Sequence, residues 1–136
     1  MPFNTMSQES IYSTLYAALA LTDSIFQIWI TLTFAVLIAT YIAERRFDRR
    51  IYLLVSGLYA FASAILFTRF ASAAYQAFYY KNLLVTRGFA PWPVPNIVSL
   101  AIGCGTFVFL FTGTLATLWF VRSTWKRSMS LHHPKT

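Results

Sequence analysis

The side chains of this chain that could do chemistry are few and lie far apart. The only two histidines, His132 and His133, are adjacent near the end of the chain, and the single cysteine is Cys104. Adjacent histidines bind a metal weakly, and no third ligand is near them. No histidine lies in an apolar stretch to ligate haem or to activate a serine or threonine as a nucleophile. We therefore expect no catalytic residue, no metal site and no cofactor, and a protein that is not an enzyme.

Two charged residues next to apolar stretches are the strongest candidates for a specific role. A charge at the centre of a bilayer costs about 2.5–3.5 kcal/mol, so such residues often mark functional sites. Counted from Ile51, Arg69 lies about 27 Å along a helix, near the bilayer boundary. Asp23 precedes the first apolar stretch and is expected at a similar depth. We predict that Asp23 and Arg69 form an intramembrane ion pair or that Arg69 reaches the head groups, and a ligand or ion site is the alternative.

Three long apolar stretches must position these residues. They cover 25–43, 51–80 and 97–121, in a chain of 136 residues that is 57% hydrophobic and 11% charged. About 20 apolar residues suffice for a helix to cross a bilayer. The runs are continuous, whereas the strands of a membrane barrel alternate. The sequence predicts an all-α, integral membrane three-helix bundle that forms one domain over residues 1–136.

Residues 8–22 have the pattern of an amphipathic helix, with Ile11, Leu15, Ala18 and Leu19 on one side. Ser24 and Gln27 have the spacing of a capping box, which favours a new helix start and a bend at Asp23-Ser24. The segment 8–22 then lies on the membrane surface or extends the first span outward.

Positive charge is concentrated in two segments that three spans place on the same side. Residues 44–50 contain four arginines, and the tail 122–136 contains Arg122, Lys126, Arg127 and Lys135. The positive-inside rule predicts that this side is cytoplasmic, with the N-terminus out and the C-terminus in. The formal net charge of +7 is explained by contacts with anionic head groups, so we expect the lipid bilayer and not nucleic acid as the partner. A bacterial cytoplasmic (inner) membrane is the expected location.

Small residues recur along two of the predicted spans. On the second span they recur at every fourth position with one glycine beside them, and on the third they lie roughly along one stripe. Small side chains let helices approach closely in lipid. These two sets are therefore candidates for helix packing or partner binding, and either they meet inside the monomer or at least one of them faces another subunit. The residues are Ser56, Gly57, Ala60, Ala64, Thr68 and Ser72 on the second span, and Ser99, Gly103, Thr106, Gly113 and Thr117 on the third.

No stretch of the chain resembles a known family specifically enough to quote. The small-residue stripes and the lack of room for a soluble domain favour a non-catalytic accessory or structural subunit that packs against other membrane helices. The alternative is a self-assembling pore, channel or holin-like protein, although the spans have no broad polar face. The expected partners are other membrane protein subunits or further copies of this chain.

Overall fold

The protein is all-α in the computed structural model, which describes residues 7–43, 48–89 and 96–132. Three helices account for nearly all of these residues: α1 (Gln8–Ile42), α2 (Arg49–Thr86) and α3 (Asn96–His132). All three are long and apolar enough to cross a membrane. The predicted all-α fold with three membrane-crossing helices is confirmed, and the chain is an integral membrane protein.

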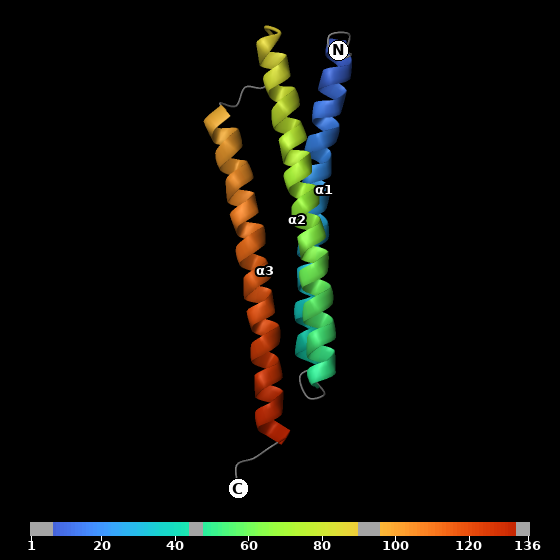
Figure 1. Ribbon diagram of the computed structural model, residues 1–136, viewed down its shortest axis with the longest axis vertical. Helices are drawn as coiled ribbons and strands as arrows, with labels where there is room; N and C mark the ends of the chain where they lie inside the picture. The colour runs from blue at the N-terminus through green and yellow to red at the C-terminus, as the bar shows by residue number, and fades with distance from the viewer. Residues whose placement is uncertain (1–6, 44–47, 90–95, 133–136) are drawn as a thin grey trace.

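The helices run antiparallel in sequence order (Figure 1). The start of α1 and the end of α2 lie at one end of the bundle, whereas the start of α2 and the end of α3 lie at the other (Figure 1). We call the second end the basic end, because Arg49, Arg50, Arg122 and Lys126 belong to it. The absolute orientation of the two ends across the membrane stays a prediction.

The break predicted at Asp23-Ser24 is wrong. α1 is one helix of 35 residues that continues through this point. The Ser24 hydroxyl donates to the Ala20 carbonyl oxygen at 2.9 Å, as in a helix interior, and does not cap a new helix. The true N-cap is Ser7, whose hydroxyl oxygen accepts from the Ser10 N–H. Residues 8–22 therefore extend the first span, and they do not form a separate helix.

α2 is longer than predicted and ends at a specific stop signal. It continues past residue 80 to Thr86, and Gly88 follows with φ +76°. The Gly88 N–H donates to the Val85 carbonyl and the Phe89 N–H to the Leu84 carbonyl, which is the pattern of a Schellman motif. Glycine adopts the left-handed conformation of this motif without strain.

α3 also continues beyond its predicted span. Its start at Asn96 is one residue from the expected position, but the helix reaches His132, so residues 122–132 of the predicted basic tail are helical. At 1.5 Å per residue the helices are about 53–57 Å long, more than the full thickness of a bilayer with its head groups. Parts of the helices must therefore extend beyond the lipid.

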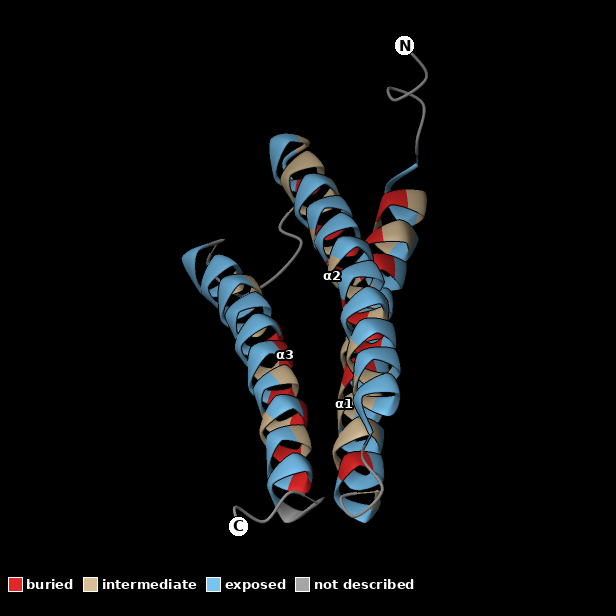
Figure 2. Ribbon diagram, turned by 60° about the horizontal axis from the view of Figure 1, so that its bottom comes forward, coloured by how far each residue is buried: buried red, intermediate tan, exposed pale blue. Residues whose placement is uncertain are grey.

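Two clusters of buried side chains hold the helices together. One lies where α1 begins and α2 ends, and it contains Ile11, Leu15, Ala18, Ala77 and Leu84. The predicted apolar face of residues 8–22 therefore packs on α2. The second cluster joins all three helices through Ile25, Trp29, Phe70, Ala73 and Leu110. On α3 the buried residues begin at Leu110, so α3 packs through its second half (Figure 2).

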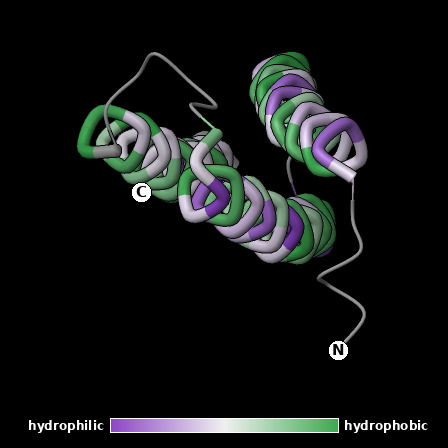
Figure 3. Tube along the Cα trace, turned by 90° about the horizontal axis from the view of Figure 1, so that it is seen from above, coloured by the Kyte–Doolittle hydropathy of each residue, from purple (hydrophilic) through white to green (hydrophobic). Residues whose placement is uncertain are grey.

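The outer surface of the bundle is apolar. Hydrophobic residues lie on several sides of each helix (Figure 3). Large side chains such as Phe34, Phe61, Ile97 and Val108 are exposed. In a soluble protein such a surface would be unfavourable, whereas in a bilayer it faces acyl chains.

Candidate functional site

The small-residue ladder of α2 lies on the outside of the bundle. Ser56 is half-buried, whereas Gly57, Ala60, Ala64, Thr68 and Ser72 are exposed. α2 packs on its neighbours through a different face, which contains Tyr59, Ser63, Phe70 and Ala73. Most of the ladder is therefore left uncovered by the other helices of the monomer.

The small-residue stripe of α3 is partly covered by the other helices. Ser99, Gly103, Thr106 and Gly113 are half-buried, and Thr117 is buried. The clearest contact is at Gly113, where a Cβ atom would lie 2.5 Å from Cη2 of Trp29. The two sets therefore do not form one shared interface.

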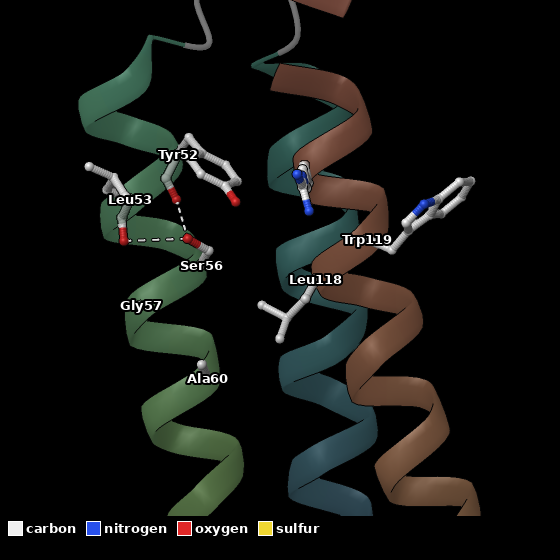
Figure 4. A pocket seen from close by; sticks show the side chains of 8 residues that line it. Tyr52, Leu53, Ser56, Gly57, Ala60, Leu118 and Trp119 are labelled. Carbon is white, nitrogen blue, oxygen red and sulfur yellow. Dashed lines mark hydrogen bonds between the residues drawn. The ribbon is translucent and has the colours of Figure 1, made fainter. Parts of the chain in front are cut away.

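Near the basic end, a groove separates α2 from α3. Its volume is about 500 Å³. Tyr52, Leu53, Ser56, Gly57 and Ala60 line the α2 side, and Leu118, Trp119 and Arg122 line the α3 side. Tyr52 and Leu118 point into the gap between the helices, whereas Trp119 points outward (Figure 4). The groove is thus an apolar trough with a cation among its lining residues.

A smaller groove of about 280 Å³ lies between α1 and α3. Phe26, Gly105, Thr106 and Phe109 line it. None of these residues is charged, so this groove offers no selective contact for a charged ligand.

Asp23 and Arg69 are both exposed, on α1 and α2. Each lies close in sequence to a member of the central cluster, Ile25 and Phe70, which supports a similar depth for the two residues. No ion pair joins them, although both belong to the described part of the chain. The structure therefore gives no support to the predicted pair and leaves both charges on the surface.

Hydroxyl groups inside the bundle make the polar contacts between helices. The Trp29 Nε1–H donates to Thr114 Oγ1 at 3.1 Å, and Thr33 Oγ1 and the Tyr59 hydroxyl lie 2.9 Å apart. At the end of the bundle opposite the basic end, Lys81 Nζ donates to Ser99 Oγ at 2.8 Å. Sequence reasoning missed these pairs, because a threonine or serine in a helix more often bonds its own backbone, as Thr31 does to the Gln27 carbonyl.

Some buried polar atoms have no hydrogen-bond partner within the described residues. They are Thr40 Oγ1, Ser63 Oγ and Trp125 Nε1. Thr40 lies near the end of α1, and its hydroxyl bonds no group of a neighbouring helix. Over 7–43, 48–89 and 96–132, no group of three His, Cys, Asp or Glu side chains could hold a metal ion. Cys104 is exposed, whereas the His132 side chain and His133 lie outside the described parts.

Comparison with protein families, with curated proteins and with solved structures finds no match for this chain.

Proposed function

We propose that this chain is a non-catalytic accessory subunit of a membrane protein complex. It packs the part of the α2 ladder from Ala64 to Ser72 against a membrane-spanning helix of a different protein. The observation that carries the proposal is the exposure of Ala64, Thr68 and Ser72, which recur every four residues on one helix.

The physical argument is that lipid provides no hydrophobic force to hold helices together. Association in a bilayer depends on close van der Waals packing, which small residues at a spacing of four allow. The Thr68 hydroxyl already donates to the Ala64 carbonyl at 2.9 Å, so a partner helix need not supply a bond to it. The ladder is thus a shallow surface on which the Thr68 hydroxyl already has a hydrogen-bond partner, and another helix can pack closely on it.

The neighbouring exposed positions of α2 show the contrast. Leu58, Phe61 and Ile65 are large and exposed, which suits contact with flexible acyl chains. Ala64, Thr68 and Ser72 provide little area for acyl chains, but they let the axis of a second helix approach.

The test is affinity purification of the tagged full-length chain from its native membranes in mild detergent, with the mass of the intact complex measured. We expect a stoichiometric foreign membrane protein. Ala64→Leu and Ser72→Leu place larger side chains on the ladder and should release the partner protein. Ala35→Leu makes the same change at an exposed position of α1 and should retain the partner. Recovery of the chain alone, or equal loss with Ala35→Leu, would contradict the proposal.

A self-assembling pore is the second candidate, and a polar stripe on α1 favours it. Asp23, Gln27 and Thr31 recur every four residues and are all exposed. In a ring of copies this stripe would line an aqueous path. Planar bilayers containing the purified chain should then conduct, and Asp23→Asn should lower cation selectivity. A homo-oligomer without conductance would exclude this function.

A further inference from the structure

The groove between α2 and α3 has an apolar floor. Leu53, Gly57 and Ala60 contribute to it from α2, and Leu118 from α3. Residues 53–60 extend about 10 Å along the helix axis. A Cβ atom at Gly57 would meet no other atom within 4 Å, so the space beside this glycine is open.

The end of the groove that faces the basic end is surrounded by cations. Arg122 lines the groove itself. Arg49 and Arg50 precede Leu53 by four and three residues, and Lys126 follows Arg122 by four, so helical spacing puts all of them on the same sides as these lining residues. All four side chains are exposed. Among the described residues nearby, the one acid is Asp48, whose carboxylate caps α2 by accepting from the Arg49 N–H at 2.6 Å.

Aromatic residues indicate the depth of this opening. The Tyr52 ring stacks on Trp125 with centroids 4.8 Å apart, and Trp119 is 71% exposed. Tryptophan and tyrosine concentrate where acyl chains meet head groups. The cations therefore lie at head-group level and the apolar floor lies deeper.

We propose that this groove binds one anionic phospholipid, with its phosphate at Arg122 and one acyl chain along Gly57 and Ala60. Charge complementarity selects this occupant: the phosphate meets Arg122 and its cationic neighbours while the chain covers the floor. A partner helix in the groove would have to cover Arg122 instead. The groove includes Ser56, Gly57 and Ala60 of the ladder, whereas the proposed partner surface is the other part of the ladder, from Ala64 to Ser72.

The test is native mass spectrometry of the full-length protein in detergent, titrated with dioleoyl phosphatidylglycerol and, as the matched zwitterionic lipid, dioleoyl phosphatidylcholine. We expect each chain to bind one phosphatidylglycerol molecule tightly and to bind phosphatidylcholine more weakly. Arg122→Gln should lower the affinity for phosphatidylglycerol about fivefold, which is the contribution of one cation near a membrane surface. Arg122→Lys should retain most of the binding. Gly57→Leu should fill the groove and reduce the amount of retained lipid.

Each variant has a matched control. Arg69→Gln makes the same charge change away from the groove, and Gly105→Leu adds the same bulk at another glycine whose Cβ would meet nothing within 4 Å. Helix content and elution volume show that each variant is folded. Equal binding of the two lipids, or Arg122→Gln and Gly57→Leu behaving like their controls, would overturn the proposal. A dimer that dissociates on Gly57→Leu while lipid binding is unchanged would make the groove a helix interface and would also overturn it.

Discussion

Trp29 on α1 and Thr114 on α3 are joined by a hydrogen bond of 3.1 Å from the indole Nε1 to the threonine Oγ1. Both residues are buried, and the same indole occupies the space that Gly113 leaves open. The Phe109 and Trp29 rings also pack in a T-shaped arrangement, with centroids 5.8 Å apart. A polar contact and a shape contact on adjacent residues of α3 thus set the register of α1 against α3.

Thr114→Val should destabilise the protein, because it keeps the shape of the side chain and leaves the buried indole N–H without an acceptor. We expect a loss of about 1–2 kcal/mol in the free energy of unfolding, measured by helix content in mixed micelles of increasing dodecyl sulfate. Thr114→Ser keeps the hydroxyl, so its free energy of unfolding should fall by less. If the two variants unfold alike, the hydrogen bond contributes nothing.

Gly113→Ala should also destabilise the protein, since its new Cβ would collide with the indole of Trp29. Overpacking of this kind costs about 1–3 kcal/mol, which exceeds the gain of about 1 kcal/mol from replacing glycine in a helix. Gly103→Ala is the control, because its Cβ would meet nothing within 4 Å, and it should be neutral or stabilising. A neutral Gly113→Ala would mean that the indole can move aside.

The continuity of α1 predicts opposite effects for two serines. Ser7→Ala removes the N-cap and should cost about 1 kcal/mol, whereas Ser24→Ala lies in the helix interior and should be neutral or slightly stabilising. The same unfolding titration measures both. A loss at Ser24→Ala comparable to that of Ser7→Ala would restore the helix start that the sequence suggested there.

The orientation across the membrane can be read by thiol labelling. In a Cys104→Ala background, cysteines placed at Ser7 and Ser130 are exposed at opposite ends of the bundle. We expect a membrane-impermeant maleimide to label Ser7→Cys in intact cells and to label Ser130→Cys only after the membrane is opened, because the basic end should face the cytoplasm. The reverse pattern would refute the predicted topology.

The number of helices and their approximate positions were predictable because lipid imposes them. Each apolar run must satisfy its own backbone hydrogen bonds, so Ile25, Ile51 and Ile97 each lie in a helix whatever their neighbours are. Helix ends were less predictable. Ser24 has the spacing of a cap, but the apolar face that contains Leu15 packs on α2. This tertiary packing outweighs the local signal, so α1 continues.

The sequence alone determined that this is a membrane protein with three helices, that most of its positive charge lies at one end of the bundle, and which residues of α2 and α3 are small enough for close packing. Only the tertiary structure decided which of those small residues are used inside: Gly113 faces Trp29, whereas Ala64 and Thr68 face outward. The physical reason is that apolar residues surround every helix, so hydrophobicity does not distinguish the inner face from the lipid-facing one. The inner face is distinguished by the shape of its side chains and by hydrogen bonds between hydroxyl groups and other helices. Both depend on which side chains of the other helices lie at the same depth.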